Sequence, residues 1–140
     1  MEWMLMPYRR YAEFSGRSRR KEYWMFYLLI VIFLTVLSVI MSMGAPTVDP
    51  LTGQVSGGGM MTTVGGGLLL LFGVGTIIPS LAVSIRRMHD QDKSGWFLLL
   101  ALIPLLGGLV VLVFMCLEGT KGPNRFGPDP KGEADPATFA

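Results

Sequence analysis

Three long apolar runs without a single charge constrain this chain more than any other feature. They cover residues 23–43, 64–85 and 96–117. Each is about 21 or 22 residues long, so a helix rising roughly 1.5 Å per residue would span the roughly 30 Å hydrocarbon core of a bilayer. All 12 Lys and Arg and all 10 Asp and Glu lie outside the runs, as the cost of charge in lipid requires. The pattern predicts an all-α integral membrane protein with three transmembrane helices.

Composition excludes several other classes of protein. The chain is 51% hydrophobic and 16% charged, whereas soluble domains carry about a quarter of charged residues. A net charge of +2 over 140 residues is too small to indicate nucleic acid as a partner. The single cysteine, Cys116, excludes an internal disulfide framework and a cysteine zinc site. We expect one membrane domain over residues 1–130, a flexible tail over 131–140, and no cofactor.

The segment before the first run favours a membrane-surface helix. Residues 1–14 carry Pro7, which suits a first helical position, and aromatic residues of the types that settle among lipid headgroups. A cleaved signal peptide is excluded, because the run at 23–43 is too long and no A-x-A-like site follows it. We therefore expect a short N-terminal interfacial helix and a retained anchor.

Orientation follows from the cations. Lys and Arg are frequent before the first run and in the second loop, residues 86–95, whereas the Gly-rich first loop, residues 44–63, has none. The positive-inside rule places the N-terminus and the second loop in the cytoplasm and the first loop outside. Three crossings then place the C-terminus outside. Lys121, Arg125 and Lys131, which follow the third run, argue against that; if residues 118–140 are inside, one run must be re-entrant or split, and we expect the second.

The motif FSGRSRRKEYW precedes the first run. Ser18 is a plausible N-cap, yet Arg19, Arg20 and Lys21 would then occupy the first helical turn, where the helix dipole disfavours cations. Anionic headgroups would offset this by roughly 1 kcal/mol per basic residue. We interpret the motif as a topology-setting cluster held by phosphate, with a dedicated lipid or protein site as the alternative.

The motif RRMHDQDKSGW joins the second and third runs. Arg86 and Arg87 would end one helix, and Asp92 or Ser94 would cap the next, as the helix dipole favours. Arg86 would reach Asp90 at i,i+4. A structural turn explains most of this motif, and a functional polar cluster is the alternative.

Together the two motifs supply the residues that we expect to bind lipid or a partner. They are Arg17, Arg19, Arg20, Lys21, Glu22, Arg86, Arg87, His89, Asp90, Asp92, Ser94 and Trp96. A single hard cation on His89, Asp90 and Asp92, and with it a metal-dependent hydrolase, is a further alternative. No catalytic arrangement can be assembled from these residues, so we expect no catalytic residues, no metal site and no enzyme.

Small residues and prolines indicate how the helices pack, because close approach and interhelical hydrogen bonds hold helices together in lipid. The expected contact residues are Gly73, Thr76, Ser80 and Ser84 in the second run and Gly108 in the third. Pro79 and Pro104 would kink the two helices at similar depth. Ordinary transmembrane proline and small-residue packing explains this pattern, and the alternative is that the kinks open a small polar vestibule beneath the 86–93 turn.

Three ordered motifs make the chain resemble the DUF805 family of small bacterial membrane proteins. They are FSGRSRRKEYW, RRMHDQDKSGWFLLL and GPNRFGPDP, and the resemblance covers about residues 1–130. The chain departs from the family pattern at residues 91–93, and its first loop resembles an insertion. The resemblance implies a multi-spanning protein of the bacterial inner membrane and no particular activity.

We therefore expect a non-enzymatic membrane component that binds anionic lipid or a protein partner through a basic cytoplasmic face. Self-association is plausible for so thin a bundle. The alternative is a subunit of an oligomeric transporter or channel, although the apolar runs lack the ionisable residues that mark ion pathways.

Overall fold

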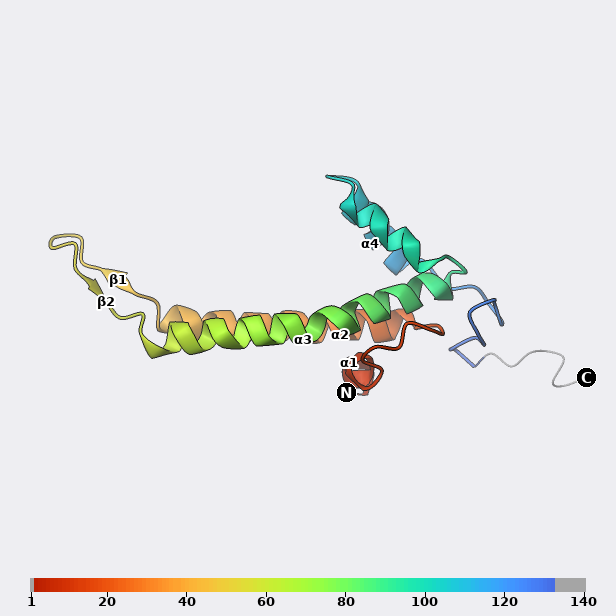
Figure 1. Ribbon diagram of the computed structural model, residues 1–140, viewed down its shortest axis with the longest axis horizontal. Coiled ribbons are helices and arrows are strands. Elements are labelled where there is room, and N and C mark those ends of the chain that lie inside the picture. The colour runs from red at the N-terminus through yellow and green to blue at the C-terminus, as the bar shows by residue number, and fades with distance from the viewer. Residues whose placement is uncertain (1, 133–140) are drawn as a thin grey trace, which may run out of the picture. The chain divides into compact units, whose positions relative to one another are not determined.

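The computed structural model describes residues 2–132 (Figure 1). The predicted tail at 131–140 therefore lies, beyond Gly132, outside the described residues. In chain order the elements are α1 (Glu2–Arg9), α2 (Arg20–Met43), β1 (Thr47–Val48), β2 (Val55–Ser56), α3 (Met60–Asp90), the 3-10 helix η1 (Gly95–Leu102) and α4 (Gly107–Cys116). The chain divides into two compact units, Leu28–Ile77 and the remainder on either side of it.

Two helices are long and apolar enough to cross a membrane. They are α2, with 24 residues and a mean hydropathy of 2.6, and α3, with 31 residues and a mean hydropathy of 2.3. A helix satisfies its own backbone hydrogen bonds, which is why an apolar run takes this form in lipid. The predicted helices at 23–43 and 64–85 are confirmed, and α3 continues further, through Arg86 and Arg87 to Asp90.

The unit Leu28–Ile77 contains most of α2, the first part of α3 and the loop that joins them. The Phe33 and Phe72 rings stack with centroids 3.9 Å apart, and Gly65 lies so close to Met41 that a Cβ would collide with it. The Gly-rich loop forms a two-stranded antiparallel hairpin, in which Thr47 pairs with Ser56 and Val48 with Val55.

The third apolar run does not form one helix, so the prediction of a continuous transmembrane helix over 96–117 is wrong. The run begins as η1, turns, and returns as α4. Pro104 lacks an N–H and disfavours helical backbone in the residue before it, and Leu105 adopts a positive φ of 67°. Pro104 thus ends a helix rather than kinking one. It lies in the turn of a helical hairpin.

Both ends of this hairpin lie at the C-terminal end of α3 (Figure 1). Gly95 faces Ile85 so closely that a Cβ would touch its Cγ2, and the Met115 carbonyl accepts a hydrogen bond from Arg87 Nε at 3.4 Å. At about 2.0 Å per 3-10 residue and about 1.5 Å per α residue, each arm is about 15 Å long. That is roughly half the hydrocarbon core. The run that folds back on itself is therefore the third and not the second, which lies within the continuous helix α3.

The expected packing residues divide into buried and open positions. Thr76, Pro79 and Ser84 are buried, and the Ser84 hydroxyl donates to the Ser80 carbonyl at 2.7 Å. At Gly73 and Gly108 no heavy atom of the described chain would lie within 4 Å of an added Cβ. The two glycines therefore mediate no close approach within this chain.

The N-terminal helix is shorter than expected. α1 begins at Glu2 and ends at Arg9, so Pro7 lies inside it rather than at its first position. Beyond it, Arg10 Nε and Glu13 Oε2 form an ion pair at 2.7 Å.

Candidate functional site

Five charged side chains are buried together beside the C-terminal end of α3. They are Arg17 (5% exposed), Glu22 (2%), Arg86 (0%), Arg87 (0%) and Asp90 (4%). Arg17 precedes α2, Glu22 lies in the first turn of α2, and the other three lie in the last turns of α3. The two polar motifs therefore meet in one cluster, which we call the buried charge cluster.

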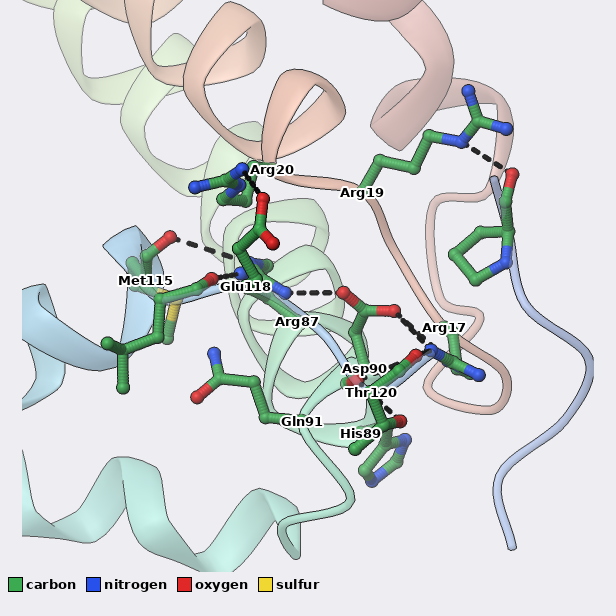
Figure 2. A network of polar contacts seen from close by, with 12 residues as sticks. Arg17, Arg19, Arg20, Arg87, His89, Asp90, Gln91, Met115, Glu118 and Thr120 are labelled. Atoms are coloured by element: carbon green, nitrogen blue, oxygen red, sulfur yellow. Dashed lines mark hydrogen bonds and ion pairs between the residues drawn. The ribbon is translucent and has the colours of Figure 1, made fainter. Parts of the chain in front are cut away.

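Asp90 connects two of its arginines (Figure 2). Its Oδ1 accepts a hydrogen bond from Arg17 Nε at 3.0 Å, and its Oδ2 accepts one from Arg87 Nη1 at 2.5 Å. The expected Arg86–Asp90 pair is wrong, because the Arg86 side chain turns to Glu22, with an Nη2–Oε1 distance of 3.1 Å. Two separate ion-pair groups thus share this end of α3.

Three guanidinium groups face only two carboxylates, and backbone carbonyls accept hydrogen bonds from other donors of these groups, while Arg86 Nε has no partner among the described residues. Arginine suits this role because its planar group presents five donors in a fixed geometry. Arg17 donates to the carbonyls of Thr120 (2.5 Å) and Gly122 (2.6 Å). Arg86 donates to the carbonyls of Glu13 (2.5 Å) and Arg10 (3.2 Å). Arg87 donates to the carbonyls of Met115 and Leu117. The cluster therefore ties the N-terminal segment and the segment after α4 to the end of α3.

This burial corrects the expectation that all the basic residues present themselves to lipid or a partner. Removing one member of a buried ion pair leaves an uncompensated charge, which costs about 3–5 kcal/mol. Arg17, Glu22, Arg86, Arg87 and Asp90 are thus in a position to hold the fold, and none of them is free to meet a headgroup in this arrangement. Arg86 and Arg87 are fully buried at this end of α3, and the polar vestibule expected beneath the 86–93 turn stays a prediction.

A separate hollow of about 410 Å³ does lie beside the turn. Its lining is mainly apolar and includes Phe14, Leu81, Ile85 and Trp96, with His89 and Ser94 at its polar edge. Trp96 is 77% exposed.

The two capping predictions have different outcomes. The Ser94 side chain accepts a hydrogen bond from the Trp96 N–H at 3.5 Å and is the N-cap of η1. Ser18 does not cap α2: its hydroxyl is buried and has no hydrogen-bond partner in the described residues. Its backbone N–H instead donates to the Arg86 carbonyl at 3.2 Å, which places it inside the cluster.

The segment after α4 covers His89 and Asp92. The Phe126 ring stacks on His89 with centroids 3.9 Å apart and planes 4° from parallel. Asn124 Nδ2 donates to the His89 carbonyl at 2.9 Å, and Arg125 pairs with Asp92 at 3.1 Å. His89, Asp90 and Asp92 thus have separate partners. Within residues 2–132 no three His, Cys, Asp or Glu side chains form a group that could hold a metal ion, so the metal-hydrolase alternative finds no site there.

Four further cations surround a hollow of about 420 Å³ at the start of α2. Arg19, Arg20, Lys21 and Lys131 line it, with Gly119 and Asp90. Arg19 Nε donates to the Pro130 carbonyl at 2.5 Å, and Arg20 pairs with Glu118 (Figure 2). The Arg19 guanidinium and the Lys21 ammonium lie 5.5 and 5.8 Å from the centre of the Trp3 ring. We call this feature the cationic hollow.

Hydrogen bonds of Asp129 hold the segment that places Lys131 at the cationic hollow. Asp129 accepts from the Lys131 N–H at 2.9 Å and the Gly122 N–H at 3.0 Å. The hydrogen bond from the Lys131 N–H, and to a smaller extent that from the Gly122 N–H, holds the pKa of the Asp129 carboxyl below its ordinary value. The pKa of Glu13 is lowered in a similar way, by its hydrogen bond with Arg10. Both carboxylates are therefore ionised at neutral pH.

Sequence reasoning missed the partners supplied after α4. Thr120, Gly122, Asn124 and Phe126 contact the buried charge cluster or His89. Gly119 is also part of the site, because a Cβ there would collide with the Asp90 carboxylate. The one signal in the sequence was the GPNRFGPDP motif, whose turn residues show that the segment bends but not what it contacts.

Known proteins resemble this chain over nearly its whole length. The family described as "Protein of unknown function (DUF805)" matches residues 11–128. The inner membrane protein YhaH of Escherichia coli K12 is 46% identical over 95% of this chain and 99% of its own length. The inner membrane protein YhaI of the same strain is 41% identical over 94% and 97%. No solved structure matches.

Proposed function

Because this chain belongs to the DUF805 family and its relatives are inner membrane proteins, we propose that it is a non-enzymatic component of the bacterial inner membrane that binds anionic phospholipid at its cytoplasmic surface. The cations that bind are those of the cationic hollow, and not the arginines of the buried charge cluster.

One observation carries this proposal: the cationic hollow has an excess of positive charge. In the described part of the chain, Glu118 pairs with Arg20, whereas Arg19, Lys21 and Lys131 have no carboxylate partner. Asp90 also borders the hollow, but both of its oxygens accept hydrogen bonds from Arg17 and Arg87. Cations next to an anionic leaflet attract its headgroups by about 1 kcal/mol each. The start of a membrane-crossing helix is where such headgroups lie.

A topology with two crossings supports the cytoplasmic placement. The positive-inside rule assigns Arg17–Lys21 and Arg86–Arg87 to the cytoplasm and residues 44–63 to the outside. The segment that contains Thr120 and Gly122 is bonded to Arg17, so it shares that side. The η1–α4 hairpin then enters the inner half of the bilayer and returns. Its exposed apolar turn, with Leu102 78% and Leu105 98% exposed, suits a hydrocarbon environment.

The test is lipid analysis of the full chain extracted in native membrane discs. In Arg19→Gln, Arg20→Gln, Lys21→Gln we expect the enrichment of anionic over zwitterionic lipid to fall more than about tenfold, given about 1 kcal/mol per cation. The matched control is Arg9→Gln, Lys121→Gln, Arg125→Gln, which makes the same charge change at exposed positions outside the hollow.

An equal loss in the two triple variants would contradict the proposal, because net charge alone would then account for the lipid. Unchanged anionic lipid together with loss of a co-purified protein would replace lipid by a protein partner.

A further inference from the structure

We propose that the cationic hollow is the headgroup half of a seat for one anionic glycerophospholipid, and that an adjoining apolar hollow holds the glycerol and the first part of an acyl chain. The inference rests on the proposed function and goes further. It replaces a diffuse attraction between cations and a leaflet by a bound lipid with a defined position.

The two hollows are neighbours, because two residues line both of them. The second hollow, of about 400 Å³, is lined by Arg20, Lys21, Trp24, Met25 and Cys116. Arg20 and Lys21 line both hollows. Along α2 the lining thus changes from charged to apolar within about one helical turn, toward the interior of the bilayer.

Charge complementarity identifies the polar end of the ligand. Positive charge and hydrogen-bond donors come from Arg19, Lys21 and Lys131. A phosphate diester would accept hydrogen bonds from these side chains and form ion pairs with them. The side chain of Asp90 does not oppose the anion, since two buried arginines already neutralise it. A neutral or cationic ligand would leave this excess of charge uncompensated.

The apolar end identifies the ligand as a lipid rather than free phosphate. Trp24 is 41% exposed, and tryptophan settles at the level between headgroup and hydrocarbon. Met25 is half-buried and lines the same hollow. A free anion would fill only the cationic hollow, whereas a phospholipid carries charge and hydrocarbon in one molecule and so could occupy both neighbouring hollows.

Lys131 distinguishes this seat from a generally basic surface. It reaches the hollow because the segment after α4 folds back, so that the Pro130 carbonyl accepts a hydrogen bond from Arg19 Nε. Lys121 is an exposed cation of the same segment that does not line the hollow. Because the two lysines carry the same charge, comparing their variants distinguishes an effect of position in the hollow from an effect of net charge.

The experiment is native mass spectrometry of the full chain released from nanodiscs that contain phosphatidylglycerol in phosphatidylcholine. We expect one phosphatidylglycerol retained per chain. Lys131→Gln should weaken its retention about fivefold, the equivalent of about 1 kcal/mol, whereas Lys121→Gln should leave it unchanged. Trp24→Ala should also weaken retention, and Trp96→Ala, an exposed tryptophan that lines neither hollow, should not.

A competition arm separates the lipid from its headgroup. Glycerol 3-phosphate, which has the phosphate without acyl chains, should displace phosphatidylglycerol only at a concentration at least about tenfold higher. Displacement at equal concentration would overturn the assignment of a lipid. Equal effects of the two lysine variants would overturn the seat, yet the proposed function would stand if the triple variant at Arg19–Lys21 alone still lost anionic lipid.

Discussion

Asp90 joins the end of α3 both to the segment before α2 and to the segment after α4. Its carboxylate pairs with Arg17 and Arg87, while its carbonyl accepts from the Thr120 N–H at 2.8 Å. The space for this arrangement comes from Gly119, because any side chain at that position would occupy the place of the carboxylate. A residue with no functional group thus determines whether two arginines remain neutralised.

At this scale we predict that Gly119→Ala destabilises the fold. The added Cβ would displace the Asp90 carboxylate from its two arginines, and a broken buried ion pair costs about 3 kcal/mol or more. The measurement is the free energy of unfolding in mixed detergent micelles. Gly73→Ala is the control, since it adds a methyl in open space within a helix and should stabilise by about 0.5–1 kcal/mol. Similar values for the two variants would show that Asp90 does not require the space at Gly119.

Among the elements, the η1–α4 hairpin differs most from what its composition indicates. A run of apolar residues at 96–117 is long enough to cross, and only Pro104 interrupts it with a residue that cannot donate a hydrogen bond. The return is possible because Gly107 lies against the Leu100 carbonyl. Because the atoms that face Gly107 are backbone atoms, no side-chain rotation could relieve the clash that a larger residue at this position would cause.

We therefore predict that Gly107→Ala opens the hairpin and that Gly108→Ala does not, because a Cβ at Gly108 meets nothing within 4 Å in the described chain. Hydrogen–deuterium exchange over residues 95–116 would report the difference. Opening should lower protection throughout η1 and the start of α4 in the first variant only. If both variants keep wild-type protection, the close approach at Gly107 is not what holds the two arms together.

For the whole molecule, the hairpin leads to the proposed topology with two crossings. In that topology both the N-terminal segment and the segment after α4 would lie in the cytoplasm, and the β1–β2 loop would lie outside. The exposed residues Ser15, Leu51 and Pro128 sample these three segments. Each is outside the buried charge cluster, so a cysteine there should leave the fold intact.

We predict the labelling of single cysteines at these positions in a Cys116→Ala background. A membrane-impermeant maleimide applied to intact spheroplasts should label Leu51→Cys, and it should label Ser15→Cys and Pro128→Cys only after permeabilisation. Labelling of Pro128→Cys but not Ser15→Cys in intact spheroplasts would show that the third run crosses the membrane after all.

Contacts of the site could be predicted from the sequence only where the two partners lie close together along the chain. The motifs around Arg17 and Arg86 were both recognised as polar clusters, since each is dense in charge over a few residues. Their pairing could not be read from the chain, because Arg17 and Asp90 are 73 positions apart and Arg17 and Gly122 are 105 apart. The Ser94 cap was predictable because it acts within two residues.

The amino-acid sequence by itself determined that this is a membrane protein and which of its segments are apolar enough to enter a bilayer. The reason is that the cost of charge in hydrocarbon is set residue by residue and can be read in any window of about 20 residues. Only the tertiary structure decided which cations are neutralised and which remain exposed, and that the third run folds back. Those outcomes depend on ion pairs between distant positions and on a single close backbone contact, and neither leaves a periodic pattern along the chain.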